Sequence, residues 1–400
     1  MTAPAQPIYL DNNATTPVDP RVFAAMAPFL GDRFGNPASS HALGRDAADA
    51  VEQARGQVAE LLGAEPEEII FTSGATEANN LALAGAALAL GVGATLIVTT
   101  TVEHASVRST CAHLARHGAE VAYVPVDGSG RVDLPQLERL VAAGRVRIVS
   151  VIAANNEIGT VAPLAEIGAL CKDRGILLHT DAAQAAGKVP LDVDAAHIDL
   201  LSLSAHKFYG PKGVGALYRR RRHRSSPVPL SPLVHGGGQE HGLRPGTLNV
   251  PGIVGLGVAS ALARQLLDEE IPRLRRLRDK LIEHLRQALG AAAVQVNGRP
   301  GDGLPGTASL TLPGVEAEAL FAACPHLCFS AGSACHALAL EPSHVLLAIG
   351  MSESLAFSTI RLGVGRFTRE DEVGAAADAI STAVRRLRGA PPEPSMVAQS

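Results

Sequence analysis

The stretch LLSLSAHKFYGPKGVG, residues 200–215, decides the fold and contains the most informative residue of the chain, Lys207. Residues 198–202 form an apolar run typical of a buried strand, and a glycine-rich turn follows Lys207. In sheets covered by helices, ligands bind at the carboxyl ends of strands, where this pattern places Lys207. An amine there can form a Schiff base with an aldehyde cofactor. Taken alone, Lys207 could equally be a surface lysine in a loop.

Short apolar runs rich in β-branched residues recur along the chain, with helical patterns between them. The expected strands cover residues 69–72, 95–100, 121–126, 147–152, 176–181, 198–204 and 213–218. Intervening stretches, such as residues 47–62 and 164–174, carry apolar residues at three- and four-residue spacing. Near-continuous apolar strands alternating with helices predict an α/β fold, in which a mostly parallel seven-stranded sheet is covered by helices on both faces.

Polar residues follow five of the expected strands. These groups are residues 73–76, 103–104, 155–157, 181–184 and 204–207. Because the carboxyl ends of parallel strands lie at one edge of a sheet, we expect all five groups to face one crevice.

Three of these groups contain residues suited to a phosphorylated ring cofactor. FTSGATEANN, residues 71–80, passes from a strand into a helix whose free N–H groups can bind phosphate, and Thr76 adds a hydroxyl. Asp181 could keep a pyridine nitrogen protonated. His104 could stack on a ring or relay a proton. Each also has an ordinary explanation: a plain strand–helix turn, a helix-capping aspartate and a structural histidine.

Two further candidates lie in the last third of the chain. Cys335 is in a loop of small residues, FSAGSACHALALEPSHV (329–345), where an accessible thiolate would be a strong nucleophile. His336 beside it could help to deprotonate the thiol. Arg361, in STIRLGVGRF (358–367), is suited to bind a carboxylate through two hydrogen bonds. The alternatives are an inert, partly buried cysteine and a structural ion pair.

Composition excludes several classes of protein. The 400 residues carry a net charge of −4, which gives no reason to expect nucleic-acid binding. Residues 78–102 are uncharged and mostly apolar, but glycines interrupt them and they become β-branched, which predicts a buried helix and strand instead of a membrane span. The N-terminus shows no export signal. We therefore expect a soluble, cytoplasmic protein without membrane attachment.

The five cysteines are expected to be reduced thiols. Cys324, Cys328 and Cys335 fall within twelve residues, which raises the idea of a metal site. However, the chain has no CxxC pair, and Cys324 and Cys328 lie at helical spacing in apolar surroundings. No structural metal is expected.

Length and pattern predict one large domain with a smaller companion. The expected division is an N-terminal segment (1–14) packing with the small domain, a large cofactor-binding domain (15–255), a small α+β domain with the Cys335 loop (256–388) and a disordered tail (389–400). Residues 253–289 are predicted to be helical, with Pro272 beginning a second helix.

Specific motifs follow one another in order along almost the whole chain. They are YLDNNATTPVDP (9–20), FGNPAS (34–39), FTSGATEANN (71–80), EHASV (103–107), NNEIG (155–159), HTDAAQ (179–184), SAHKFYGPKGVG (204–215), HGGGQE (235–240), RPGT (244–247), SAGSACHALALEPSHVL (330–346) and IRLGVGRF (360–367). Together they resemble cysteine desulfurases of the IscS/NifS type, within the class V aminotransferases of pyridoxal phosphate fold-type I. The resemblance runs from about residue 8 to residue 387.

The resemblance implies that pyridoxal 5′-phosphate (PLP) is the cofactor and L-cysteine the substrate. Lys207 would hold the cofactor as a Schiff base and remove the Cα proton of cysteine. His104 would stack on the ring, and Cys335 would take the sulfur as a persulfide while L-alanine leaves. Arg361, with Asn36, would hold the substrate carboxylate.

The remaining implied contacts are all to the cofactor. Its phosphate would be bound by Ala75, Thr76, Ser204 and His206, with Thr247 reaching it from the other subunit of a homodimer. Asp181 would pair with the pyridine nitrogen, while Asn156 and Gln184 would contact the phenolic oxygen of the ring.

The resemblance further implies sulfur delivery for iron–sulfur cluster or other thio-cofactor assembly. The partner would be an iron–sulfur scaffold or another sulfur-acceptor protein, and Cys335 is a candidate transient iron–sulfur ligand. The chain departs from the family where His-Ala-Leu-Ala follows Cys335 and where the tail lacks an aromatic-ended extension.

Two alternatives stay open. A selenocysteine lyase shares Cys-His at 335–336 together with the TDAAQ, HKFYGP, GGGQE and RPGT motifs. A non-catalytic, scaffold-bound regulatory homologue would keep the fold without turnover, although intact Lys207, Asp181, His104 and Cys335 argue against it.

Overall fold

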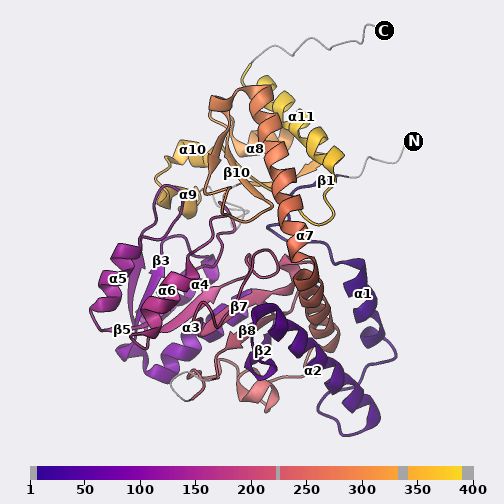
Figure 1. Cartoon of the computed structure of the whole chain (residues 1–400), viewed down its shortest axis with the longest axis vertical. Helices are drawn as coiled ribbons and strands as arrows, with labels where there is room; N and C mark the ends of the chain where they lie inside the picture. Colours follow the sequence, from indigo (N-terminus) through magenta and orange to yellow (C-terminus); the bar gives the residue numbers. More distant parts are fainter. Residues whose placement is uncertain (1–6, 222–225, 332–340, 390–400) are drawn as a thin grey trace.

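The computed structural model describes residues 7–221, 226–331 and 341–389. A seven-stranded sheet forms its larger part (Figure 1). The strands, in spatial order, are β2 (Ile69–Thr72), β8 (Gly215–Arg219), β7 (Leu200–Ser204), β6 (Leu177–Asp181), β5 (Val146–Ser150), β3 (Leu96–Thr100) and β4 (Glu120–Val124). All are parallel except β8, which runs antiparallel to both of its neighbours. The predicted mostly parallel, seven-stranded sheet is confirmed.

Both faces of this sheet are covered because successive strand residues point to opposite sides. Leu177 and Leu200 join a hydrophobic cluster with α3 (Ala75–Leu90) and α4 (Ala105–Arg116). Their neighbours Leu178 and Leu201 join a larger cluster on the other face. That cluster includes residues of α2 (Ala42–Leu62), α5 (Leu134–Ala142), α6 (Leu164–Lys172) and α7 (Val250–Leu289). The uncharged stretch 78–102 is thus a buried helix followed by a buried strand, as predicted.

The long helix α7 connects the two parts of the molecule (Figure 1). The predicted helix start at Pro272 is wrong, since α7 continues through this residue. A proline inside a helix loses one backbone hydrogen bond, but packing on both sides of it outweighs that loss. Ile253 and Leu256 lie in the core of the large sheet, whereas Leu277 and Leu281 lie in a second core.

One window of α7 is long and apolar enough to cross a membrane, but 56% of that window is buried inside the protein. Burial of this kind is typical of a core helix in a soluble protein.

The second core surrounds a four-stranded antiparallel sheet. Its order is β12 (Ser330–Ala331), β13 (Thr359–Gly363), β10 (Thr307–Thr311) and β9 (Gln295–Asn297). The helices α8 (Ala317–Ala323) and α11 (Glu370–Leu387) pack into this core. The strand β1 (Ile8–Tyr9) pairs in parallel with β11 (Leu327–Cys328). The division of the chain at residue 255 stays a prediction, because α7 runs through that point without a break.

The remaining elements are short. They are α1 (Pro20–Met26), α9 (His344–Ala348), α10 (Glu353–Phe357) and the 3-10 turns η1 (Ala27–Leu30), η2 (Pro66–Glu68), η3 (Val92–Ala94), η4 (Ala205–Lys207), η5 (Gln239–Gly242) and η6 (Ala291–Ala293).

Candidate active site

One cavity of about 1400 Å³, open to solvent, lies at the carboxyl ends of the large sheet. Ten of the residues named from the sequence line it. They are Ala75, Thr76, His104, Asn156, Asp181, Gln184, Ser204, His206, Lys207 and Arg361. Asp181 and Ser204 end strands of the large sheet, seven others come from loops, turns and helix starts that follow its strands, and Arg361 comes from β13 of the smaller sheet. The expected crevice therefore exists.

Lys207 ends the short turn η4 that directly follows β7. Its Nζ donates to the carbonyl oxygens of Asn13 and Ala14, both at 2.8 Å. These contacts hold the amine inside the cavity and beside the N-terminal segment, so Lys207 is not an ordinary surface lysine.

Asp181 is the last residue of β6 and is only 3% exposed. Its Oδ2 accepts a hydrogen bond from Asn79 Nδ2 at 2.7 Å, and its Oδ1 accepts one from the backbone N–H of Ala183 at 2.9 Å. These neutral donors orient the carboxylate and leave its charge uncancelled. A fixed, buried negative charge is suited to hold a protonated pyridine nitrogen.

His104 caps the N-terminus of α4. Its Nδ1 accepts from the backbone N–H of Ser106 at 3.1 Å and lies 2.8 Å from the Ser106 hydroxyl. The accepting Nδ1 assigns the ring proton of the neutral imidazole to Nε2. Asn79 Nδ2 also donates to Ser106 Oγ at 2.9 Å, so one amide connects the supports of His104 and Asp181.

The start of α3, the end of β7 and the turn η4 meet where a phosphate would lie. The helix α3 begins at Ala75, and the first N–H groups of any helix lack partners within that helix. A Cβ added to Gly74, whose φ is +153°, would lie 3.5 Å from Ser204 Oγ, so this turn packs closely against the end of β7. Burial, followed by repulsion from Lys207, lowers the pKa of His206 to about 4, so its ring is neutral at pH 7.

These residues fit PLP. The helix start and the serine hydroxyl suit its phosphate, Lys207 suits its aldehyde and Asp181 suits its ring nitrogen. The individual contacts named from the sequence remain predictions.

Arg361 is 3% exposed and already has a carboxylate partner. Its Nη2 donates to Asp11 Oδ1 at 2.9 Å, and its Nη1 donates to the Asn156 carbonyl oxygen at 3.1 Å. Its buried Nε has no hydrogen-bond partner among the described residues. Arg361 thus forms the structural ion pair that the sequence left open, and it keeps one donor for a ligand.

Two predicted residues of the described part of the chain do not line this cavity. Asn36 and Thr247 line a different one, beside α2 and the turn η5. The role of Thr247 in the other subunit stays a prediction. Cys335 lies outside the described residues.

Sequence reasoning missed three buried groups around the site. They are Asn79, Glu103 and Lys188. Burial, with some repulsion from Asp181, raises the pKa of Glu103 to about 8. The sequence signal for Asn79 was a polar residue in an otherwise mostly apolar helix, four positions after the residue that begins the helix. Lys188 follows a glycine, which suggested an exposed turn.

Comparison with known proteins gives the family. The family model described as aminotransferase class-V matches residues 8–375. The chain is 45% identical over 395 residues to the cysteine desulfurase IscS of Rickettsia felis, covering 98% of this chain and 95% of that protein. It is 48% identical over 393 residues to a mouse cysteine desulfurase, covering 98% and 84%. A solved structure named NifS-like protein superposes with a TM-score of 0.86 at 38% identity, covering 94% of this chain and 98% of the other.

The chain therefore belongs to the aminotransferase class-V family, whose cysteine desulfurases depend on PLP. The predicted resemblance to cysteine desulfurases of the IscS/NifS type is confirmed, as is PLP fold-type I.

Proposed function

We propose that this protein is a PLP-dependent cysteine desulfurase, which converts L-cysteine to L-alanine and transfers the sulfur atom to Cys335 as a persulfide. One observation carries the proposal: a single cavity contains Lys207, Asp181, His104, Arg361 and the start of α3. No simpler binding role requires a half-buried lysine inside a cavity, a buried aspartate and a helix N-terminus together.

When bound, PLP supplies an electron sink that allows bonds at the substrate Cα and Cβ to break. Lys207 would bond the cofactor aldehyde and afterwards move the Cα proton. Its amine lines the cavity directly after the end of β7. Asp181 would keep the ring nitrogen protonated, and His104 would stack on the ring with its Nε2 proton available.

Arg361 orients the substrate through its carboxylate. Its free Nε and the guanidinium nitrogens shared with Asp11 and Asn156 provide the donors.

Sulfur transfer balances as follows. The Cys335 thiolate forms an S–S bond to the substrate sulfur while the C–S bond breaks, and its electron pair stays on the substrate carbon. That carbon, Cβ, then takes up one proton and Cα regains the proton that Lys207 removed, which gives alanine, so no external oxidant or reductant is needed for this half of the reaction.

The finer assignments are also proposals. Asn36 and Thr247 share a cavity away from Lys207, which supports a homodimer in which each chain completes the site of the other. The acceptor is an iron–sulfur scaffold or another sulfur-acceptor protein, and the location is cytoplasmic. A monomer in solution at working concentration would contradict the dimer.

Two substitutions test the function. Lys207→Ala should abolish the visible band of bound PLP near 390–420 nm and lower alanine formation by at least ~10⁴-fold. Cys335→Ser should keep the band but form no enzyme persulfide, as measured by thiol-specific labelling after incubation with cysteine. Purified wild-type protein that takes up no PLP, or that releases selenide from selenocysteine but no sulfur from cysteine, would contradict the proposal.

A further inference from the structure

The amine of Lys188 is buried beside the active site, although its position in a turn suggested exposure. The turn is closed by hydrogen bonds from the backbone N–H groups of Lys188 and Val189 to Ala185. Gly187 has a φ of +70°, and a Cβ there would lie 2.9 Å from Ala263. The turn is therefore packed against α7, and the lysine side chain runs inward.

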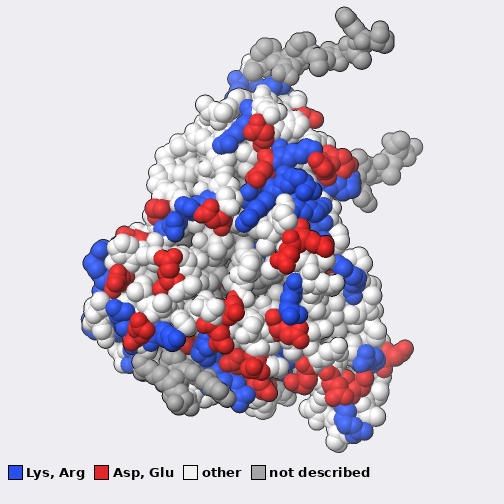
Figure 2. Space-filling model, in the orientation of Figure 1, with Lys and Arg blue, Asp and Glu red and all other residues white. Residues whose placement is uncertain are grey.

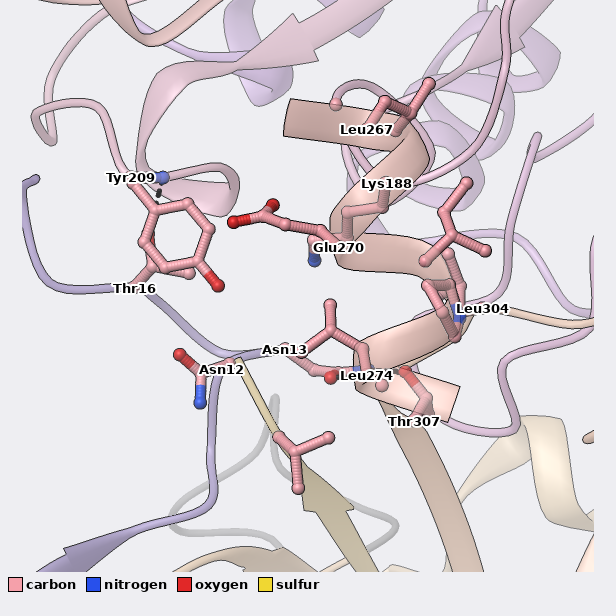
Figure 3. A pocket seen from close by; sticks show the side chains of 15 residues that line it. Asn12, Asn13, Thr16, Lys188, Tyr209, Leu267, Glu270, Leu274, Leu304 and Thr307 are labelled. Atoms are coloured by element: carbon pink, nitrogen blue, oxygen red, sulfur yellow. Dashed lines mark hydrogen bonds between the residues drawn. The ribbon is translucent and has the colours of Figure 1, made fainter. Parts of the chain in front are cut away.

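The hydrogen-bond partner of the Lys188 amine is a neutral side chain, although a carboxylate lies nearby. Figure 3 shows its side chain among those lining a small cavity beside α7, with Glu270 facing the same space. The Glu270 carboxylate is already paired with Arg366 through two hydrogen bonds. Lys188 Nζ instead donates to Gln184 Oε1 at 2.7 Å. Among the described residues Lys188 makes no ion pair.

Gln184 connects this amine to the catalytic lysine. Its Nε2 donates to the carbonyl oxygen of Asn13 at 2.7 Å, and the same oxygen accepts from Lys207 Nζ at 2.8 Å. Gln184 is 3% exposed and lines the cofactor cavity. A continuous path of hydrogen bonds therefore runs from Lys188 through Gln184 and Asn13 to Lys207.

Both ends of the Gln184 amide select one orientation. A carbonyl oxygen only accepts, and the Lys188 amine in its protonated form only donates. Turning the amide by 180° would set Oε1 against the Asn13 carbonyl and Nε2 against the Lys188 amine, losing both bonds. In the observed orientation, Nε2 has a second hydrogen that no bond to Asn13 uses. That hydrogen is suited to the phenolic oxygen of PLP, which needs a donor.

We propose that Lys188 is a positioning residue, which fixes the Gln184 amide so that its nitrogen, and not its oxygen, faces the ring oxygen of PLP. The inference rests on the proposed function, because Gln184 has this task only when PLP is bound. Burial, followed by repulsion from Lys207 and Arg361, lowers the pKa of Lys188 from 10.5 to about 7. Burial therefore disfavours the protonated form of this amine, and the hydrogen bond to Gln184 gives a reason why a lysine is found at this position.

The test is a pH titration of the visible band of the resting PLP-loaded protein. A hydrogen bond from Gln184 Nε2 to the ring oxygen stabilises the ionised form of that oxygen, so losing this bond raises the apparent pKa of the band. Lys188→Met keeps the apolar stem but removes the amine that holds Gln184 Oε1. With the amide no longer fixed, the pKa of the band should rise by about one unit, a tenfold change in the ratio of the two forms. The matched control is Lys172→Met, the same change at an exposed position of α6, which should leave the band unchanged.

A double variant separates positioning from a direct effect of charge. If Lys188 acts through Gln184, then Lys188→Met should shift the pKa of the band no further in a Gln184→Ala background. A full shift in that background would overturn the inference. Lys188→Arg keeps a hydrogen-bond donor to Gln184, so its visible band should have the same apparent pKa as that of the wild type. This variant still tests the inference if Lys188→Met is too unstable to purify, because a shifted band in Lys188→Arg would contradict it.

Failure of this inference differs from failure of the proposed function. An unshifted band in Lys188→Met, with normal PLP uptake and alanine release by the wild type, would overturn only the role of Lys188. A wild-type protein without a visible band would overturn the function itself.

Discussion

The two walls of the active-site cavity hold their charged groups in different ways. On the wall formed by the seven-stranded sheet, Asp181 and Lys207 are held by neutral groups: an asparagine amide, a backbone N–H and two backbone carbonyls. On the wall formed by the four-stranded sheet, Arg361 is held by the carboxylate of Asp11. On the first wall, neutral donors orient the Asp181 carboxylate, whereas on the second wall Arg361 already contacts a carboxylate like that of its proposed ligand.

This difference matches two kinds of occupant. Neutral hydrogen bonds fix a charge without reducing the field that it exerts on a resident group, which is the requirement for a permanently bound cofactor. A partly compensated arginine binds an incoming carboxylate less tightly, because the ligand must share or displace Asp11. Less tight binding suits a substrate whose product must leave the same place.

Outside the cavity, Figure 2 shows basic and acidic side chains interspersed over much of the visible face. That face therefore carries no charge of one sign over its whole extent.

The largest effect is expected on the wall of the large sheet. Asp181→Asn removes a buried charge while keeping size and shape, and we expect kcat for alanine formation to fall by about 10²–10³-fold, because the ring nitrogen loses its counter-charge. PLP uptake should persist, since Lys207 and the start of α3 are unchanged. Steady-state kinetics with PLP in excess measures the effect.

Asp173→Asn is the control, because it makes the same change at an exposed position after α6. If Asp181→Asn lowers kcat by less than about tenfold, the negative charge of Asp181 does not make the proposed contribution to catalysis.

Local patterns predicted the residues of the large-sheet wall well. Asp181 ends a buried strand and Lys207 ends the turn that follows another, and the chain around each contains the whole signal: an apolar run, a polar residue and a turn. Topology alone then brings strand ends to one edge. The pairing of Asp11 with Arg361 had no such local signal, because the two residues are 350 positions apart and meet only when the N-terminal segment folds against β13.

The same distinction explains the wrong prediction on α7 and the buried amine of Lys188, which no local pattern indicated. Pro272 is a helix-breaking signal by local rules, yet α7 has a hydrophobic core on each side of it, and tertiary packing overrides the local preference. Lys188 follows a glycine in a real turn, but whether that turn faces solvent depends on α7, which is distant in sequence. Sequence patterns specify elements and strand ends, and long-range packing determines the groups that support them.

A smaller effect should come from Asp11→Asn. The amide oxygen can still accept from Arg361 and hold it, but the full guanidinium charge becomes available to the substrate carboxylate. We expect KM for cysteine to fall by about 2–5-fold with kcat little changed. Steady-state kinetics at several cysteine concentrations gives both constants.

Arg361→Lys provides the comparison in the opposite direction. It keeps a positive charge but loses the planar fork, and it should raise KM by about 10–100-fold. A raised KM in Asp11→Asn as well would mean that Asp11 positions Arg361 and does not compete with the substrate. The proposed contrast between the two walls would then be lost.

The smallest effect concerns Glu103, which lies next to His104 on the large-sheet wall and is fully buried. Its Oε1 accepts from Thr100 Oγ1 at 2.6 Å and from the backbone N–H of Ile152 at 2.9 Å, while its Oε2 has no partner among the described residues. With its pKa raised from 4.5 to about 8 by burial, this carboxyl is neutral in the folded protein at pH 7. Because burial keeps Glu103 protonated, Asp181 remains the negatively charged carboxylate in this part of the site.

The sign of the resulting pH dependence follows from proton uptake. Between pH 4.5 and 8 the folded state retains the proton of Glu103 and the unfolded state has lost it, so raising the pH through this window favours unfolding. Glu103→Gln imitates the neutral form and cannot titrate. The decline in melting temperature of the protein without PLP from pH 5 to pH 8 should therefore be smaller in Glu103→Gln than in the wild type, by roughly a few degrees.

Comparing the two proteins at each pH cancels the contributions of all other titrating groups, provided that they behave alike in both. Glu138→Gln, the same change at an exposed position of α5, should follow the wild-type curve. Equal slopes for the wild type and Glu103→Gln would mean that Glu103 is ionised in the folded state. Asp181 would then share the wall with a second buried negative charge, and the neutral support that distinguishes this wall from the wall of Arg361 would not hold.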